Sequence, residues 1–165
     1  ILEIGAVSHQ YMSALAIKIA EFGGAALVMD YGHTQTSLGD TVQALWRHQP
    51  ISPLEAPGEC DVTAHVDFAS LARAAEASGA VVSGPVTQAS FLTQIGLHHR
   101  ADALKRRADP AQSLDIDRAL ARLTATAPEA GAGGKPVPGM GALFKAMAIT
   151  SGDLPPPPGF EPDGY

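Results

Sequence analysis

Three polar clusters, each standing where an extended stretch or a loop meets the next element, constrain the fold of this chain most strongly. They are Asp30-Tyr31-Gly32-His33 after the apolar run 25–29, the stretch 39–45 with Asp40 and Gln43, and the stretch 61–68 with Asp61, His65 and Asp67. In an open α/β sheet, ligands bind outside the carboxyl ends of the strands, where the next helix begins. We therefore expect these clusters to form one rim of a binding crevice.

The spacing of apolar residues predicts an α/β fold in which helices and strands alternate. Asp40 and Asp67 each precede a predicted helix and suit its amino-terminal cap, and Ser8 suits the cap of the first helix. The pattern predicts strands at 25–30, 80–86 and 143–149, an extended stretch at 62–66, and helices at 12–22, 41–48, 68–78, 89–95, 98–107 and 113–126.

The chain reads as one domain, 1–154, followed by a proline-rich tail, 155–165. Residues 127–139 are predicted to be a flexible linker within the domain, because the cluster Gly131-Ala132-Gly133-Gly134 has no strand before it. A glycine-rich run binds a nucleotide only between a strand and a helix. The run Pro155 to Pro158 is expected to end the ordered part.

Charge and composition exclude several classes of function. The net charge of −6 disfavours binding to nucleic acid. The single cysteine, Cys60, excludes an internal disulfide, and the histidine spacing matches no metal motif. The longest apolar run is too short to span a membrane. We therefore expect a soluble intracellular protein that binds no metal.

Five blocks in a characteristic order resemble the MidA-type family of S-adenosylmethionine (SAM)-dependent methyltransferases. Mitochondrial members of that family methylate arginine on a subunit of respiratory complex I and are needed for its assembly. The resemblance covers about Leu2 to Phe160, and the blocks are GGAALVMDYGH, GDTVQALWRH, PLEAPGECDVTAHVDFASLARAA, GPVTQASFL and MGALFKAMAI.

The resemblance implies a particular part of a class I, Rossmann-like fold. The predicted strands would be the fifth, the sixth and the antiparallel seventh, which inserts between them. The glycine-rich loop that holds SAM in the family has no counterpart here, so the chain is expected to be the carboxyl-terminal half and to need the amino-terminal half for SAM. Strand 25–29 would then pair with that missing half, or self-associate through its open edge.

The resemblance also implies what the polar clusters do. Arginine is protonated at neutral pH, and carboxylates such as Asp30, Asp40 or Asp61 could clamp its guanidinium. Asp40 is equally plausible as a helix cap and as a substrate contact, whereas Asp67 is favoured as a cap only. His33 is favoured as a loop residue, and Gln88 fits either a cap or a crevice residue. The predicted substrate-binding set is Asp30, Tyr31, His33, Asp40, Gln43, Asp61, His65 and Gln88.

Two functions of different classes remain open at this point. In one, the chain is the substrate-side part of a protein arginine methyltransferase that acts on a partner protein with SAM as cofactor. In the other, it is an inactive fragment that serves as an assembly or interaction module. The family resemblance implies the bacterial cytoplasm or the mitochondrial matrix as its location.

Overall fold

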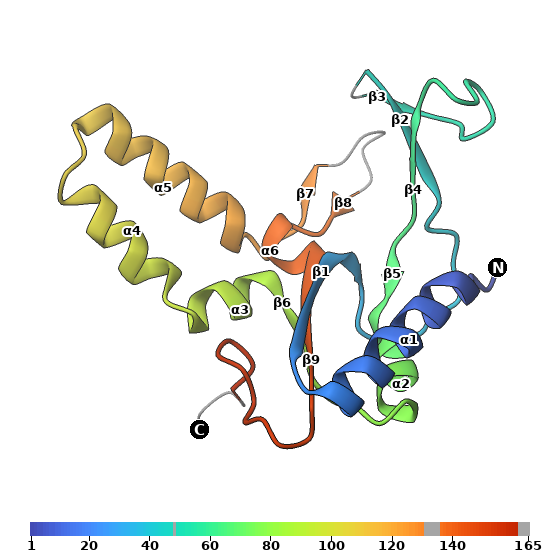
Figure 1. The fold of residues 1–165 in the computed structure, drawn as a ribbon. Coiled ribbons are helices and arrows are strands. Elements are labelled where there is room, and N and C mark those ends of the chain that lie inside the picture. Colours follow the sequence, from blue (N-terminus) through green and yellow to red (C-terminus); the bar gives the residue numbers. More distant parts are fainter. Residues whose placement is uncertain (48, 131–135, 162–165) are drawn as a thin grey trace.

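A four-stranded sheet forms the centre of the molecule. The computed structural model describes residues 1–47, 49–130 and 136–161. Within them the sheet has the order β5-β1-β9-β6 (Figure 1). Its strands are β1 (Ala25–His33), β5 (Val66–Asp67), β6 (Val81–Thr87) and β9 (Phe144–Thr150).

The position of β9 confirms the predicted topology. It pairs antiparallel with β1 on one side, with Val28 opposite Met147, and antiparallel with β6 on the other, with Val82 opposite Ile149. This is the arrangement expected for a seventh strand inserted between the fifth and the sixth. The short strand β5 was not expected in this sheet. It pairs parallel with β1 at Gly32 and His33 and covers that end of the edge.

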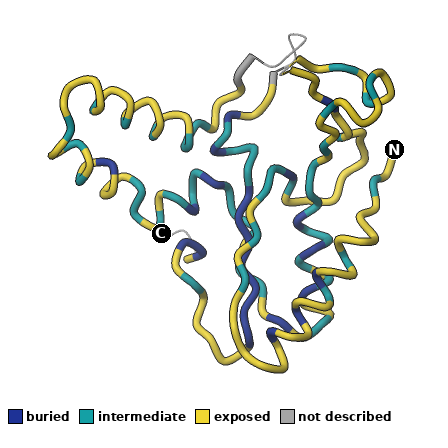
Figure 2. Tube along the Cα trace, turned by 45° about the horizontal axis from the view of Figure 1, so that its top comes forward, coloured by how far each residue is buried: buried dark blue, intermediate teal, exposed yellow. Residues whose placement is uncertain are grey.

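Alternate residues of β9 face two separate cores, which explains why this strand is almost wholly buried. Met147 and Ile149 pack with α1 (Ala6–Phe22) and α2 (Phe68–Ala77) on one face of the sheet. On the other face, Ala146 and Ala148 pack with Phe91 and Phe160. We call the sheet, α1 and α2 the body. Figure 2 shows buried positions concentrated in the middle of the body, where β9 is almost wholly buried, while β1 alternates mainly between exposed and intermediate positions.

A second, three-stranded antiparallel sheet projects from the body and is called the arm, residues 40–63. Its strands are β2 (Gln43–Trp46), β3 (Gln49–Ile51) and β4 (Asp61–Thr63), in the order β3-β2-β4 (Figure 1). The predicted helix at 41–48 is therefore wrong. A short helix this close to Pro50 would be marginal in isolation, whereas as a strand the segment pairs on both sides.

The remaining helices lie at the β6 side of the sheet. They are α3 (Gln88–Gln94), α4 (Leu97–Lys105), α5 (Pro110–Thr124) and α6 (Met140–Leu143), of which α4 and α5 form a projecting hairpin joined by the Lys105–Asp117 ion pair (Figure 1). The helices predicted at 89–95, 98–107 and 113–126 are thus present with small shifts. The first helix begins after Gly5, so Ser8 does not cap it.

Two predictions about the end of the chain have different outcomes. The glycine cluster 131–134 lies outside the described residues, and the segments beside it pair as β7 (Glu129–Ala130) and β8 (Pro136–Val137). The expectation that order ends at the proline run is wrong, because Phe160 is buried against Phe91 with ring centroids 5.3 Å apart.

Candidate functional site

A cavity of about 460 Å³, lined by both polar and apolar residues, lies where the carboxyl ends of β1 and β5 meet the beginnings of α1 and α2. The strand ends bring His33, Val66 and Asp67 to it, α1 brings Ser8 and His9, and α2 brings Ser70 and Leu71. The rest of its wall is formed by residues 3–5, Ser37, Gly39, Thr41, Val42, Ala64 and His65. The cavity therefore stands where an α/β sheet binds its ligands.

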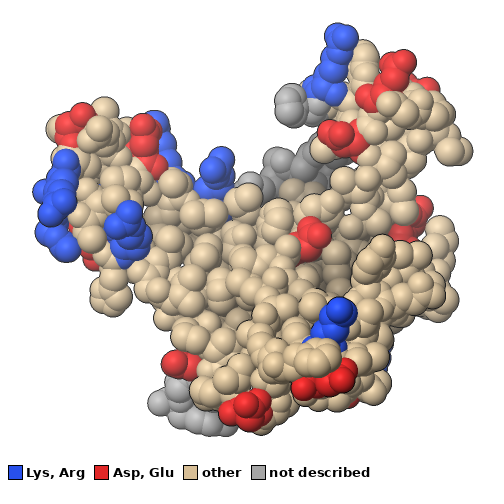
Figure 3. Space-filling view, in the orientation of Figure 1, with Lys and Arg blue, Asp and Glu red and all other residues tan. Residues whose placement is uncertain are grey.

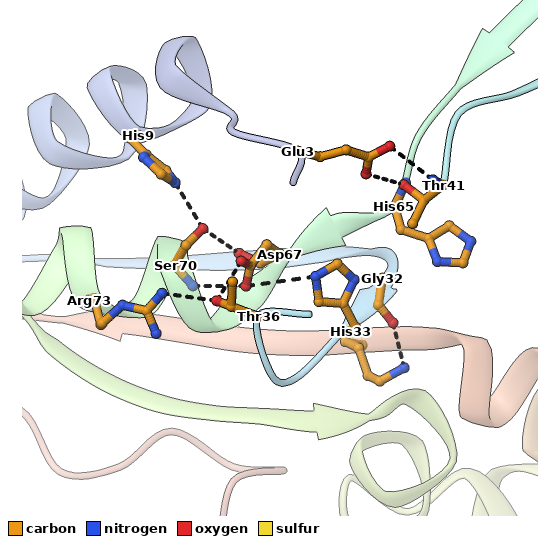
Figure 4. A network of polar contacts seen from close by, with 11 residues as sticks. Glu3, His9, Gly32, His33, Thr36, Thr41, His65, Asp67, Ser70 and Arg73 are labelled. Carbon is orange, nitrogen blue, oxygen red and sulfur yellow. Dashed lines mark hydrogen bonds and ion pairs between the residues drawn. The ribbon is translucent and has the colours of Figure 1, made fainter. Parts of the chain in front are cut away.

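Asp67 is the centre of the polar network in this cavity (Figure 4). Its Oδ1 accepts a hydrogen bond from the Ser70 backbone N–H at 3.0 Å, which caps α2 as predicted, and its Oδ2 accepts one from the Thr36 hydroxyl at 2.6 Å. His33 Nε2 lies 3.9 Å from Oδ1. The Arg73 guanidinium donates a hydrogen bond to the Thr36 hydroxyl at 3.0 Å and so helps to fix the orientation of Thr36.

These contacts decide the charge of Asp67. Burial, the largest single influence, raises its pKa, but the hydrogen bonds from Thr36 and Ser70, together with His33 and Arg73, outweigh burial and lower the pKa below its ordinary value. The carboxyl group is thus ionised at neutral pH. It presents a negative charge to a cavity that also holds three histidines, His9, His33 and His65.

Glu3 is the second carboxylate in the cavity wall, and it fastens the start of the arm. Thr41 donates to Glu3 from its backbone N–H at 2.9 Å and from its hydroxyl at 2.5 Å. These two bonds lower the pKa of Glu3. The Thr41 hydroxyl also accepts the His65 N–H at 3.0 Å, so both chain segments at the base of the arm are joined to the amino-terminal segment.

His65 belongs to an aromatic cluster beside the cavity. Its ring stands edge-on to Tyr31 at 5.8 Å between centroids, and Tyr31 stands edge-on to Phe144 at 5.7 Å. Burial, together with the positive charges of His33 and Lys145, lowers the pKa of His65. His65 is therefore a neutral aromatic wall of the site at neutral pH.

Lys145 fixes the end of β1 from inside the protein. Its Nζ donates to three backbone carbonyl oxygens, those of Gly32 at 2.8 Å, Ala142 at 2.6 Å and Leu143 at 3.0 Å. Burial lowers the pKa of this amine. Because the three bonds join β1 to the α6–β9 junction, Lys145 sets the position of the strand end that carries His33.

Gly32 allows β5 to approach that strand end. A Cβ atom at this position would lie 2.1 Å from the Val66 carbonyl oxygen. Only glycine therefore permits the pairing that brings Asp67 opposite His33. On the other side of the cavity, His9 Nε2 lies 2.8 Å from Ser70 Oγ and joins α1 to α2.

The structure brings together only part of the predicted substrate-binding set. His33 and His65 line the cavity, and Tyr31 packs behind His65. Asp30 accepts a hydrogen bond from the adjacent Tyr31 N–H at 2.8 Å. Gln88 is buried and donates to the Leu123 carbonyl at 2.9 Å. Gln43 and Asp61 lie exposed on the arm, opposite Thr63 and Leu45.

Asp40 also lies at the start of the arm and caps no helix. Its Oδ1 accepts the Val42 N–H at 3.2 Å in a local turn. The carboxylates that line the cavity are instead Glu3 and Asp67. The position of Asp67 directly before a helical pattern indicated the cap, but nothing in the sequence indicated that the same carboxylate would face Thr36 and His33. Lys145 was missed because a lysine inside an apolar strand pattern gives no sign of its three carbonyl partners.

Two strand-to-helix junctions among the described residues lack glycine. The strand-to-helix junctions at β5–α2 and β6–α3 are Asp67-Phe68 and Thr87-Gln88, and neither contains the glycines that let a backbone approach a cofactor. No group of three metal-binding side chains occurs among the residues that the structure describes. None of the described helices is both long enough and apolar enough to cross a membrane.

The antiparallel strand β9 between the parallel strands β1 and β6 is consistent with the Rossmann-like fold of SAM-dependent methyltransferases. The chain belongs to the family described as "Putative S-adenosyl-L-methionine-dependent methyltransferase", whose model matches residues 1–86. The family is SAM-dependent. This confirms the MidA-type resemblance and the cofactor that it implied.

Relatives with known names agree with this family. Residues of the chain are 42% identical over 109 residues to the mitochondrial protein arginine methyltransferase NDUFAF7 of Danio rerio, covering 66% of this chain and 25% of that protein. The mitochondrial NDUFAF7 homologue of Drosophila melanogaster is 34% identical over 154 residues, covering 93% of this chain and 32% of that protein. The chain thus spans between a quarter and a third of these relatives.

Two solved structures from Burkholderia thailandensis share the fold. An uncharacterised protein superposes with a TM-score of 0.72 at 25% identity, covering 96% of this chain and 39% of that one. A likely methyl transferase bound to S-adenosyl-homocysteine superposes with a TM-score of 0.69 at 25% identity, covering 93% and 36%. The fold of the chain is therefore part of a larger methyltransferase fold.

Proposed function

We propose that this chain is the substrate-side part of a SAM-dependent protein arginine methyltransferase, and that its cavity receives the side chain of the target arginine. The observation that carries the proposal is the ionised carboxylate of Asp67 in a cavity at the strand ends, in a chain whose relatives are named protein arginine methyltransferases. A guanidinium is a planar cation and pairs best with a carboxylate.

In this proposal each side chain of the cavity has a distinct task. Asp67 binds the guanidinium and neutralises its charge, and Thr36 and Ser70 hold that carboxylate in one orientation. Glu3 lies across the same cavity and supplies further negative potential. His65 and Tyr31 form the apolar side that keeps water away from the alkyl stem. Methyl transfer depends mainly on alignment and exclusion of water, which these residues serve.

The proposed substrate is an arginine of a partner protein, and for mitochondrial relatives the sequence resemblance implies a complex I subunit. The cofactor would be bound by the part of the full-length protein that the relatives have and this chain does not span. The proposed location follows these relatives, in the mitochondrial matrix, or the cytoplasm for a bacterial protein.

A chimera tests the proposal. In the Danio rerio relative, the matched stretch would be replaced by residues of this chain, and transfer of labelled methyl groups from SAM to arginine would be measured with complex I subunits as substrate. We expect transfer, and its loss in the Asp67→Ala variant. Calorimetric titration with SAM would check that the cofactor site is intact. A folded chimera that binds SAM and methylates nothing would refute the proposal and favour an interaction module.

A further inference from the structure

We propose that the arm docks an extended, basic segment of the substrate protein along the open edge of β4, and that this segment leads the target arginine into the cavity. This inference rests on the proposed function and adds a recognition surface to it. The arm lies outside the four-stranded sheet, and none of its described residues belongs to the two cores of the body.

The first argument is continuity between arm and cavity. The segment that enters the arm contributes Gly39, Thr41 and Val42 to the cavity wall, and the segment that leaves it contributes Ala64 and His65. The first of these segments continues directly into β2 and the second follows directly from β4. A polypeptide that lies on β4 is therefore led to the mouth of the cavity.

The second argument concerns the backbone of the arm. In the order β3-β2-β4 both outer strands have an edge that pairs with no other strand of the described part of the chain. Strand β3 contains Pro50, which lacks a backbone N–H donor and so weakens that edge. Strand β4 contains no proline and carries exposed Asp61 and Val62. An extended peptide that adds to a sheet uses such an edge, with main-chain hydrogen bonds for affinity and side chains for specificity.

The third argument is charge. Between residues 40 and 63 the sequence has four carboxylates, Asp40, Glu55, Glu59 and Asp61, and Arg47 is its sole lysine or arginine. All four carboxylates are exposed, and so is Arg47, whose guanidinium lies over the Trp46 ring, 4.5 Å from its centroid, so carboxylates outnumber basic side chains four to one. Figure 3 shows acidic side chains on the projecting part of the molecule, beside a basic side chain. The chemistry of the arm therefore complements lysine and arginine, not an acidic or purely apolar partner.

The chimera described above would be tested for binding of a synthetic peptide with one central arginine and lysines on both sides, by fluorescence anisotropy. We expect Glu59→Lys with Asp61→Lys to raise Kd by about tenfold, since two exposed charge contacts are reversed. The control, Glu21→Lys with Glu76→Lys on α1 and α2, changes the net charge equally and should alter Kd by less than about threefold. Equal effects of both variants, or none of the arm variant, would overturn the proposal.

The peptide itself tests the strand edge. Alternate backbone N–H groups of an extended peptide point to opposite sides, so N-methylation of every second residue blocks pairing in one phase and permits it in the other. We expect one phase to abolish binding and the other to preserve it. Equal binding of the two peptides would refute docking along β4. Glu59→Gln with Asp61→Asn provides a milder arm variant if the reversal prevents folding.

Methylation kinetics separate this proposal from the proposed function. The arm variant should raise KM for the peptide and leave kcat/KM for N-acetylarginine amide unchanged, because that small compound does not reach the arm. Transfer to both compounds with no effect of the arm variant would remove the docking proposal and leave the proposed function intact. Peptide binding that depends on the arm, without any methyl transfer, would remove the proposed function and leave docking at the arm.

Discussion

The body and the arm differ in what holds them together, and the difference separates stability from recognition. In the body, β9 is paired on both edges and packed on both faces, and Met147 and Ile149 are fully buried. In the arm, Ala44 is buried, but Leu45, Trp46 and Val62 remain exposed. The body therefore carries most of the folding free energy. The arm is free to vary its surface for binding, because little of the fold depends on it.

The comparison predicts its largest contrast for truncations of large apolar side chains. Ile149→Ala should lower the free energy of unfolding by about 2–5 kcal/mol, because it opens a cavity in the core. The matched change in the arm, Val62→Ala, removes a side chain that is 56% exposed and should cost less than about 0.5 kcal/mol. Urea unfolding measures both. A similar loss from the two changes would show that the arm is part of the folding core.

The next effect lies where the arm returns to the body. Gly32→Ala places a Cβ 2.1 Å from the Val66 carbonyl oxygen, so β5 must move, at a cost of about 1–3 kcal/mol. Gly39→Ala is the control, because a Cβ there meets no atom within 4 Å. Hydrogen exchange should show faster opening at Asp67 in the first variant alone. Unchanged protection there would contradict the role given to Gly32.

Lys145→Met tests how the body positions the cavity. The substitution keeps the volume of the stem but leaves the Gly32, Ala142 and Leu143 carbonyls without their shared donor, and we expect a loss of about 1–3 kcal/mol. Lys18→Met, on the exposed face of α1, should be neutral. Thermal unfolding compares the two. Equal stability of both variants would mean that backbone pairing alone fixes the end of β1.

The same division explains what the sequence could predict. The runs 25–30, 80–86 and 143–149 are apolar and bounded by glycine or polar residues, and each proved to be a strand. The stretch 41–48 has an apolar spacing compatible with either helix or strand, and its neighbours β3 and β4 decided the outcome. Pairing with residues up to twenty positions away is not visible in a local pattern.

The sequence indicated where a cavity would lie better than it indicated which residues line it. The rule about strand ends predicts a rim at this position, and His33 and His65 of the predicted set line the cavity there. The same rule could not distinguish Asp30 from Asp67. Asp30 accepts a hydrogen bond from the adjacent Tyr31 N–H, whereas Asp67 caps a helix and also faces the cavity. That distinction depends on Thr36 and Gly32, whose positions follow from the tertiary fold. Glu3 enters the site for the same reason, through Thr41.

The two aspartates provide a matched test of activity. In the chimera, Asp67→Asn should keep the helix cap, since asparagine caps about as well as aspartate, but should lower methyl transfer by about tenfold because the charge is lost. Asp40→Asn should leave transfer nearly unchanged, as Asp40 is exposed and accepts a hydrogen bond from the nearby Val42 N–H. If Asp40→Asn gave the larger loss, the assignment of the guanidinium contact to the cavity would be wrong.

The smallest expected effect is the pH dependence of stability that arises from the partly buried His65. The pKa of His65 is lowered by burial and by the charges of His33 and Lys145, so below its ordinary pKa of about 6.5 the unfolded chain binds the proton more readily than the folded one. The contribution of His65 to the free energy of unfolding is thus constant above about pH 7. That free energy falls as the pH drops below about 6.5. His65→Asn should flatten this slope. Urea unfolding at a series of pH values measures the slope. A rise in the free energy of unfolding on acidification below about pH 6.5 would contradict a neutral His65 beside the cavity.

Asp67 affects stability in a separate, more acidic pH range. Because its pKa is lowered, its contribution to the free energy of unfolding is lost only at that more acidic pH, as the carboxylate is protonated.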